Sequence, residues 1–457
     1  MLLKNIPKRK LLLLFGDIII ILFSLNLALI IRFGHLSDFG YWINKPIILL
    51  IVIISYVLSF YIFNLFDIQT KFLRTQSIVL FLCALLSVAL IIAIFFYLFP
   101  FGMGRGIFFI SFLFIGILAF LWRIFFNMLF IVAIPKKKIL IVGAESRKQV
   151  FSLLTHDNPE YKVAGFLSDF PHKRNPNSSL SYLGNIASLE KVVEEYGIDD
   201  IVVAREAGKN KELKRALVNC RLKGVRIFDL STLYENVVNK IPVLYTKDQW
   251  FLYCQGFDGL GSAVYRNIKR SFDFVVSFSL LVALSPLVVL ISLLIKLTSK
   301  GPVFYIQERL GENEKQYKMY KFRSMFADAE KDEPKWASEN DERVTLMGKV
   351  LRKTRLDELP QLINVLKGEM SLIGPRPERE YFIRILREKI PYYSLRFAVK
   401  PGITGWAQVN YRYGATIDDA VEKVCYDLYY IKNMSFFLDL RILLKTIRVC
   451  LFGVGWR

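Results

Sequence analysis

An adjacent pair of carboxylates, Asp357 and Glu358, is the first candidate for chemistry in this sequence. The pair lies in LDELPQLINVLKG (356–368). A helix tolerates proline only in its first turn, so Pro360 predicts a helix that begins close to Asp357 and ends at Gly368. The positive end of the helix dipole would keep Asp357 ionised and would also attract a phosphate. Such pairs also commonly do no more than cap a surface helix, and their spacing does not separate the two interpretations.

The rest of the chemical inventory is narrow. All three histidines precede residue 173, which removes Ser-His-Asp triads and histidine-bound metals from any catalytic region beyond that point. The five cysteines show no paired or CxxC spacing, which fits reduced core thiols and offers no zinc site. Any catalysis in that region must therefore depend on carboxylates and basic residues.

The composition is that of a membrane protein. Hydrophobic residues make up 54% of the 457 positions, which is more than a soluble enzyme normally tolerates. The formal net charge of +21 fits nucleic acid, anionic lipid or a phosphorylated substrate. The basic residues abut apolar segments and no recognition motif appears, so we expect no nucleic-acid partner and expect contact with membrane lipid.

Four long apolar runs predict four transmembrane helices within residues 1–135. They cover about 11–31, 46–66, 78–99 and 107–134, and each is close to the ~20 residues that span the hydrocarbon core. Basic residues precede the first run, separate the second from the third and follow the fourth. By the positive-inside rule, the N-terminus and the chain after Lys136 begin in the cytoplasm.

Residues 136–255 change character and alternate strands with helices. Buried strands are indicated by KKKILIVGA (136–144) and DDIVVA (199–204), and a helix by IASLEKVVEEYG (186–197). This alternation predicts a cytoplasmic, Rossmann-like α/β module with a parallel sheet. The stretch 143–146 lacks the GxGxxG spacing of dinucleotide sites, so we favour a structural or regulatory module, which could mediate a homodimer.

The apolar stretch SFSLLVALSPLVVLISLLIK (277–296) contains a Ser-Pro pair near its middle. Basic residues flank it on both sides, so no orientation of a single span satisfies the positive-inside rule. Pro286 removes a backbone donor and predicts a kink near Ser285, whose hydroxyl can satisfy a freed backbone group. We favour a re-entrant helix-break-helix at about 266–298, with an ordinary kinked span as the alternative.

The C-terminal region, about 262–457, resembles the bacterial sugar transferase family of monotopic phosphoglycosyl transferases. The resemblance is carried by KRSFDFVVSFSLLVALSPLVVLISLLIKLTSKGPVFYIQERLG, YKFRSM, RKTRLDELPQLINVLKGEMSLIGPRPE and KPGITGWAQVN. The preceding spans and α/β module resemble, more loosely, the large subfamily described as exopolysaccharide biosynthesis polyprenyl glycosylphosphotransferase. The fold implied for residues 262–457 is a mainly α monotopic catalytic domain.

This resemblance implies transfer of a sugar phosphate from a UDP-sugar to undecaprenyl (polyprenyl) phosphate, with release of UMP. The reaction starts exopolysaccharide, capsule or O-antigen synthesis at the cytoplasmic face of the bacterial inner membrane. Family members have a re-entrant helix broken at a Ser-Pro pair, which matches Ser285 and Pro286. They also use Mg²⁺ and an adjacent Asp-Glu pair, which falls on Asp357 as nucleophile and Glu358 as the Mg²⁺ ligand.

Cations for the diphosphate are expected nearby. YKMYKFRSM (317–325) alternates basic with apolar residues, which predicts a strand with its basic side chains on one side. Lys321 and Arg323 are the first candidates to bind the diphosphate, and Arg355, beside the acidic pair, is a third. A solvated basic face is the alternative for each of them.

A rigid turn is predicted where two prolines bracket one arginine. Pro375, Arg376 and Pro377 restrict the backbone on both sides of the arginine. The family uses this Pro-Arg-Pro loop near the nucleotide, so the three residues carry over as nucleotide-site residues.

Two later segments bear on the membrane. EKIPYYSLRFAVKPGITGWAQVN (388–410) has the composition of a headgroup interface and equally of a folded core edge. The tail 426–456 has apolar residues at helical spacing with charges among them, which fits an interfacial helix better than a span.

Two other classes of function account for only part of the sequence. A membrane scaffold or regulator of polysaccharide export would explain the basic charge but leaves Asp357, Glu358 and the Pro-Arg-Pro loop without a role. A nucleotide-sugar-modifying enzyme would place its chemistry in residues 136–255, where GxGxxG and a Tyr-x-x-x-Lys segment are both missing.

Overall fold

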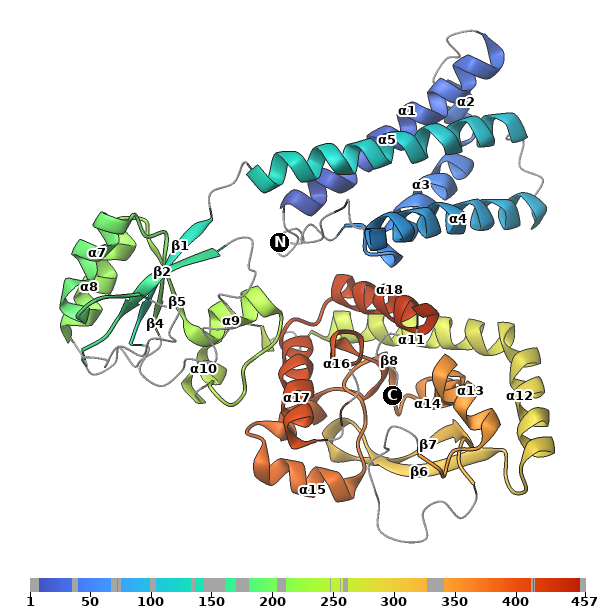
Figure 1. The fold of residues 1–457 in the computed structure, drawn as a ribbon. Coiled ribbons are helices and arrows are strands. Elements are labelled where there is room, and N and C mark those ends of the chain that lie inside the picture. Colours follow the sequence, from blue (N-terminus) through green and yellow to red (C-terminus); the bar gives the residue numbers. More distant parts are fainter. Residues whose placement is uncertain are drawn as a thin grey trace. The chain divides into compact units, whose positions relative to one another are not determined.

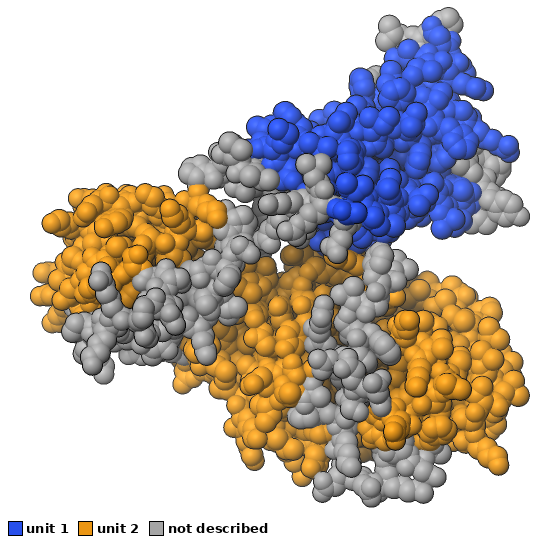
Figure 2. All heavy atoms as spheres, in the orientation of Figure 1, with its two compact units in different colours: residues 1–135 blue, residues 136–457 orange. Residues whose placement is uncertain are grey.

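The computed structural model separates the chain into two compact units, residues 1–135 and 136–457 (Figure 2). The structure describes residues 8–34, 40–66, 72, 75–98, 104–132, 136–143, 161–169, 181–203, 211–246, 248–254, 256–257, 262–326, 341–411, 414 and 416–452.

The first unit is helical throughout its described part (Figure 1). Its elements are α1 (Lys8–Phe33), α2 (Gly40–Ile43), α3 (Pro46–Ile62), α4 (Thr75–Leu98) and α5 (Arg105–Val132). Helices α1, α4 and α5 are long and apolar enough to cross a membrane, whereas α3 is a shorter apolar helix of 17 residues. Each of the four predicted runs therefore contains a helix, and three of these helices reach the length of a span.

A buried ion pair joins the two ends of this unit's sequence. Helix α1 packs against α5, and the Arg123 guanidinium donates to both carboxylate oxygens of Asp17, each at 2.9 Å. Both side chains are almost fully buried, and the guanidinium also lies over the ring of Phe60 at 4.3 Å. Charges at such positions are rare within apolar helices and are normally paired, as they are here.

The second unit begins with a five-stranded parallel sheet, which confirms the α/β prediction. The strands are β1 (Lys137–Val142), β2 (Tyr161–Leu167), β3 (Tyr182–Gly184), β4 (Asp200–Val203) and β5 (Arg226–Asp229), in the spatial order β3-β2-β1-β4-β5. Of the glycine turn predicted at residues 143–146, the structure describes only Gly143. The predicted loop 171–179 also lies outside the described residues.

Alternate side chains of β1 pack against helices on the two faces of the sheet. Leu140 and Val142 join the core formed with α7 (Leu189–Tyr196) and α8 (Lys211–Leu222). Helix α7 directly follows the 3₁₀ turn η1 (Ile186–Ser188). Ile139 and Ile141 join the core formed with α9 (Leu230–Val238). The two-residue period of the strand thus produces a three-layer module.

The broken helix has the geometry that its sequence predicts. Helix α11 (Ala263–Ala283) and helix α12 (Ser285–Thr298) are bent by 61° at their junction. Pro286 cannot donate to the carbonyl of Val282, four residues earlier, and the Ser285 hydroxyl donates to that carbonyl instead at 2.8 Å.

The remainder of the second unit is mainly helical, with two small two-stranded sheets. An antiparallel hairpin of β6 (Phe304–Leu310) and β7 (Gln316–Phe322) encloses the turn η4 (Glu312–Glu314), and β8 (Ser371–Ile373) pairs in parallel with β9 (Gly402–Thr404). The other elements are α10 (Asp248–Tyr253), α13 (Leu346–Thr354), η5 (Leu356–Glu358), α14 (Gln361–Lys367), α15 (Glu380–Lys389), η6 (Tyr393–Ala398), α16 (Trp406–Asn410), α17 (Ile417–Lys432) and α18 (Phe436–Phe452).

The segment 388–410, whose position the sequence left open, contributes to the core. Tyr393, Phe397 and Trp406 are buried in the largest apolar cluster of the second unit. The segment is therefore a core edge.

Two helices, α17 and α18, occupy the predicted tail, separated by a break at residues 433–435. On α18, Asp439 accepts hydrogen bonds from Tyr265 and Lys269 of α11 and from Tyr430 of α17. This helix thus fastens the broken helix to the rest of the domain.

Candidate active site

The acidic pair lies in the 3₁₀ turn η5, between α13 and α14. Arg355, directly before the turn, has the left-handed backbone conformation (φ 60°) that ends α13. Helix α14 begins only at Gln361, with Pro360 as its N-cap, and ends at Gly368 as expected. Asp357 is therefore one turn before the helix and not at its cap, which corrects the sequence-based placement.

Glu358 is buried and is approached by three cations from three parts of the chain. Arg376 donates from both terminal nitrogens, with Nη2 2.6 Å from Oε1 and Nη1 3.3 Å from Oε2. Lys321 Nζ and Arg355 Nη1 each lie 3.8 Å from Oε1. Burial by itself would raise the pKa of Glu358, but the three cations hold that pKa well below its usual range. Glu358 is thus ionised at neutral pH.

Asp357 has the opposite electrostatic environment. Burial and the neighbouring charge of Glu358 raise its pKa, and Lys321 and Arg355 offset this only partly. Helix α14 begins too far along the chain to place its dipole at Asp357, and burial with the Glu358 charge raises the pKa of Asp357 instead of lowering it. Its Oδ1 is buried and accepts no hydrogen bond from the described residues. The described residues therefore leave this oxygen open to a metal ion or to a phosphorus atom of a substrate.

Lys321 reaches the pair from β7, as the strand prediction requires. Tyr317, Met319 and Lys321 lie on one face of the strand, whereas Lys318 lies on the other and is exposed. Burial lowers the pKa of Lys321 to about 8, against the opposing effect of Glu358. The basic side chains of this segment are thus divided between two faces and not gathered on one.

Arg323 is placed elsewhere. Its guanidinium donates to the carbonyls of Ser299 and Lys300 at 2.9 Å each and to the Ser299 hydroxyl at 2.6 Å. These contacts fasten the end of α12 to the strand hairpin, and no ion pair in the described part of the chain joins Arg323 to Asp357 or Glu358. The structure gives Arg323 an anchoring contact, and its binding of a diphosphate stays a prediction.

The Pro-Arg-Pro loop follows β8, and its arginine is brought onto the acidic pair. Sequence reasoning placed Pro375, Arg376 and Pro377 near a nucleotide but did not foresee the direct contact between Arg376 and Glu358. It also missed a buried pair behind the loop, in which Arg396 donates from Nε to Asp427 Oδ2 at 2.8 Å. The only signal for this pair in the sequence is charge within otherwise apolar segments.

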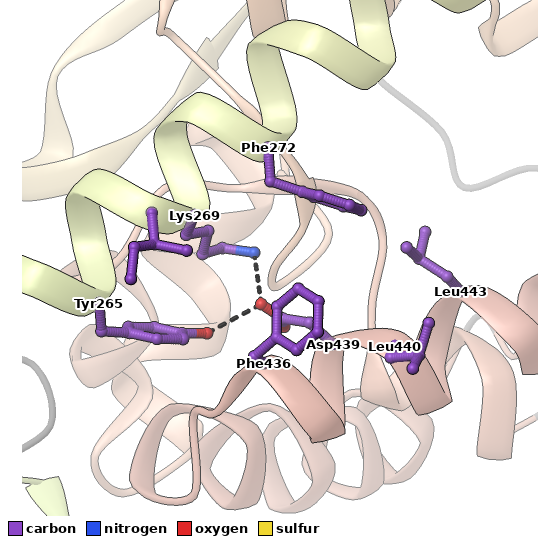
Figure 3. Close-up of a pocket in the computed structure, with 8 residues that line it drawn as sticks. Tyr265, Lys269, Phe272, Phe436, Asp439, Leu440 and Leu443 are labelled. Carbon is purple, nitrogen blue, oxygen red and sulfur yellow. Dashed lines mark hydrogen bonds and ion pairs between the residues drawn. The ribbon is translucent and has the colours of Figure 1, made fainter.

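A small cavity lies apart from this site, between α11 and α18 (Figure 3). It is lined by apolar side chains together with the contacts of Tyr265 and Lys269 to Asp439. Its volume of about 20 Å³ has room for about one water molecule. It is therefore a packing gap and not a substrate site.

The geometry bears on the Mg²⁺ that the family resemblance implies. No group of three or more His, Cys, Asp or Glu side chains in the described ranges could hold a metal ion. Both oxygens of Glu358 are paired with Arg376, so Glu358 does not fit the role of Mg²⁺ ligand in this arrangement. Asp357 Oδ1 has no partner among the described residues, which fits a Mg²⁺ that takes one protein oxygen and otherwise substrate phosphates and water.

Comparison with known proteins relates the chain to two family models. Residues 264–453 match the family described as bacterial sugar transferase, and residues 62–228 match a model described as a CoA-binding domain. The first match contains the broken helix, the acidic pair and the Pro-Arg-Pro loop.

Three curated relatives carry transferase names. The UDP-N-acetylgalactosamine-undecaprenyl-phosphate N-acetylgalactosaminephosphotransferase of Aeromonas hydrophila is 41% identical over 56% of this chain and 60% of its own length. The undecaprenyl-phosphate glucose phosphotransferase of Komagataeibacter xylinus is 46% identical over 39% of this chain and 35% of its own length. The UDP-glucose:undecaprenyl-phosphate glucose-1-phosphate transferase of Escherichia coli (strain K12) is 44% identical over 68% and 67%, respectively.

The fold and site define a membrane-associated protein with a buried carboxylate pair among three cationic side chains. The chain belongs to the bacterial sugar transferase family. It spans less than two thirds of the length of the first two relatives described above.

Proposed function

We propose that the protein transfers a sugar phosphate from a UDP-sugar to undecaprenyl phosphate and releases UMP. This reaction would initiate the synthesis of exopolysaccharide, capsule or O-antigen. The observation that carries the proposal is the buried pair of Asp357 and Glu358, surrounded by Arg376, Lys321 and Arg355, in a chain of this family.

The reaction would proceed in two displacements at phosphorus. An oxygen of ionised Asp357 attacks the β-phosphorus of the UDP-sugar, and the bond from that phosphorus to the bridging oxygen breaks, so that UMP leaves with the electron pair. A phosphate oxygen of undecaprenyl phosphate then attacks the phosphorus of the aspartyl intermediate. The bond to Asp357 breaks, which regenerates its carboxylate and forms the undecaprenyl diphosphate sugar.

The cations around Glu358 supply the charge that this chemistry needs. Three positive side chains face Glu358 and Asp357, so the cluster keeps a net positive charge that suits a diphosphate even with both carboxylates ionised. Arg376 and Arg355 can each present several N–H donors to phosphate oxygens, and Lys321 contributes a compact charge. Glu358 holds the three cations in place and keeps them from repelling one another.

Mg²⁺ is proposed as the cofactor. Asp357 Oδ1 would be its protein ligand, with substrate phosphate oxygens and water completing the shell. When bound, the ion would neutralise charge on the phosphate oxygens.

The membrane arrangement is proposed from the apolar helices. The N-terminal region would span the membrane with α1, α4 and α5, and with α3 if the bilayer adapts to its shorter length. Helices α11 and α12 would enter the cytoplasmic leaflet and return, consistent with the 61° bend and with basic residues on both flanks. The active site would face the cytoplasm, and the α/β module could mediate a homodimer.

Nucleotide release tests the proposal. The full chain, purified into nanodiscs, is supplied with Mg²⁺, undecaprenyl phosphate and a panel of UDP-sugars, and UMP is separated from UDP. We expect UMP release that requires the lipid for turnover, is lost in Asp357→Asn and persists in Glu388→Gln, which alters an exposed side chain on α15.

Each other outcome has a defined meaning. Release of UDP would contradict phosphosugar transfer and indicate ordinary glycosyl transfer. No release with any sugar would favour a scaffold or regulator of polysaccharide export. A covalent intermediate predicts exchange of labelled UMP into UDP-sugar without lipid, and full turnover in Asp357→Asn would rule out the assigned nucleophile.

A further inference from the structure

The Pro-Arg-Pro loop is held by hydrogen bonds to three consecutive backbone carbonyls. The carbonyl of Pro375 accepts from the backbone N–H of Gly402 at 2.9 Å. The carbonyl of Arg376 accepts from Arg396 Nη2 at 2.8 Å, and that of Pro377 accepts from Arg309 Nη1 at 3.2 Å. The loop itself forms no helix or strand, so these contacts from three separate elements determine its path.

The arginine behind the loop is itself fixed. Besides its bond to the Arg376 carbonyl, Arg396 donates from Nε to Asp427 on α17 and from Nη1 to the Tyr393 hydroxyl, each at 2.8 Å. Arg396 and Asp427 are both buried, with side-chain exposures of 7% and 2%. Burying an ion pair is costly, and an apolar pair of the same shape would often be at least as stable. Stability alone therefore gives a poor account of this pair.

Arg309 approaches the same loop from β6. Its side chain is largely buried, and its Nη2 donates to Gln307 at 2.7 Å while Nη1 lies 3.7 Å from Glu378. Two arginines from distant parts of the sequence thus donate to the consecutive carbonyls of Arg376 and Pro377, which belong to the two peptide groups that flank the Pro377 Cα.

We propose that Arg396, with Asp427, and Arg309 are positioning residues that fix the Pro-Arg-Pro loop so that the Arg376 guanidinium faces Glu358 and the reacting phosphate. This inference rests on the proposed function, in which Arg376 stabilises charge on phosphate oxygens. The two arginines act on the backbone of the loop. No ion pair in the described ranges joins either of them to Asp357 or Glu358.

The conservative variant Arg396→Lys separates positioning from charge. Lysine keeps the positive charge opposite Asp427 but cannot present the planar fork that reaches Asp427, Tyr393 and the Arg376 carbonyl together. We expect kcat per active site, counted by the UMP burst, to fall about 10²-fold, the loss typical of a misplaced catalytic group. The KM for the UDP-sugar should change little, since Arg376 would act mainly in the transition state.

Hydrogen–deuterium exchange provides a readout that needs no substrate. Peptides covering the amides of Gly374, Arg376, Glu378 and Arg379 should exchange faster in Arg396→Lys and in Arg309→Lys than in the unaltered full chain. Tyr393→Phe removes only one of the bonds that fix Arg396 and should give an intermediate increase. This milder variant keeps the test informative if Arg396→Lys fails to fold.

A second buried ion pair on α17 provides the matched control. Lys432 pairs with Glu235, both largely buried, and neither contacts the loop through any described hydrogen bond. Glu235→Gln should lower the thermal stability of the chain without changing loop exchange or kcat per active site.

The outcomes are distinguishable. Unchanged loop exchange in both Arg396→Lys and Arg309→Lys, or equal effects in Glu235→Gln, would overturn the positioning role. Faster loop exchange with unaltered kcat would also overturn it. If the unaltered chain releases no UMP with any UDP-sugar, the proposed function fails, while the exchange data still decide whether these arginines hold the loop.

Discussion

Arg376 and Glu358 form a two-point contact in which each terminal nitrogen of the guanidinium faces its own carboxylate oxygen, at 2.6 and 3.3 Å. The two residues come from different segments, the Pro-Arg-Pro loop and the turn η5. The contact fixes both groups at the place where a diphosphate would bind. Glu358 is thus paired with three cations of the site, Arg376, Lys321 and Arg355.

Because Glu358 pairs with three cations, neutralising Glu358 should lower the free energy of unfolding more than neutralising Arg376 does. Glu358→Gln leaves Arg376, Lys321 and Arg355 without their shared anion and should lower the free energy of unfolding by about 3 kcal/mol. Arg376→Gln leaves Glu358 with two cations and should cost about 1 kcal/mol. Chemical unfolding of the two variants in the same detergent checks the order, and a larger loss for Arg376→Gln would contradict it.

Asp357→Asn should separate activity from stability. Because burial and Glu358 raise the pKa of Asp357, its ionised form is unfavourable in the folded state. The neutral amide removes this cost, so we expect loss of UMP release together with a gain of about 1 kcal/mol in the free energy of unfolding. The gain should be present at neutral pH and vanish below the ordinary pKa of 3.8, where the carboxyl is protonated in both states. Equal stabilities at neutral pH would contradict this prediction.

Lys321 predicts a loss of activity on the alkaline side. Burial lowers the pKa of Lys321 to about 8, so the side chain loses its charge as the pH rises through that value. We expect kcat/KM for the UDP-sugar, which reports the free enzyme, to decline above about pH 8. In Lys321→Arg the charge persists, and the decline should move to higher pH even if the maximum is lower. If kcat/KM declines over the same pH range in Lys321→Arg, the decline must be caused by a group other than Lys321.

Local patterns predicted the parts of the fold that depend on neighbouring residues. The strands of the α/β module follow from short apolar runs, and the bend at Ser285 follows from Pro286, because each cause lies within a few residues of its effect. The Pro360 argument located a helix but put its start three to four residues too early, since a 3₁₀ turn intervenes.

Contacts between segments that are distant in the sequence could not be predicted from sequence patterns. Arg323 and Arg376 have the same chemistry, but tertiary structure directs one to Ser299 and the other to Glu358. The placement of Lys318 and Lys321 on opposite faces of β7 could have been predicted from the sequence, because residues three apart point to opposite faces of a strand. The pairing of Arg396 with Asp427 depends on the packing of η6 against α17, which residue spacing does not encode.

Gly374, just before the Pro-Arg-Pro loop, should not tolerate a side chain. A Cβ there would lie 2.3 Å from the carbonyl oxygen of Lys400 and 2.9 Å from the nitrogen of Gly402, both backbone atoms that cannot rotate away. Gly374→Ala should therefore separate β8 from β9, reduce UMP release and lower stability by about 2 kcal/mol. Gly104→Ala, whose Cβ would meet nothing closer than 3.9 Å, is the control. Similar melting temperatures for the two variants would refute the close approach.

The pair of Asp17 and Arg123 predicts a compensating double variant in the N-terminal unit. Asp17→Asn leaves the buried guanidinium without its anion and should lower the stability of the full chain in detergent by about 3 kcal/mol. Arg123→Met alone leaves the carboxylate unpaired and should cost a similar amount. The combination removes both charges and should recover most of the loss, because two neutral side chains in an apolar bundle need no partner. Ser87→Ala, which removes only the neutral contacts of its hydroxyl with Ser59 and with the Ala84 carbonyl, should cost only about 0.6 kcal/mol. Additive losses in the double variant would show that the two charges do not depend on each other.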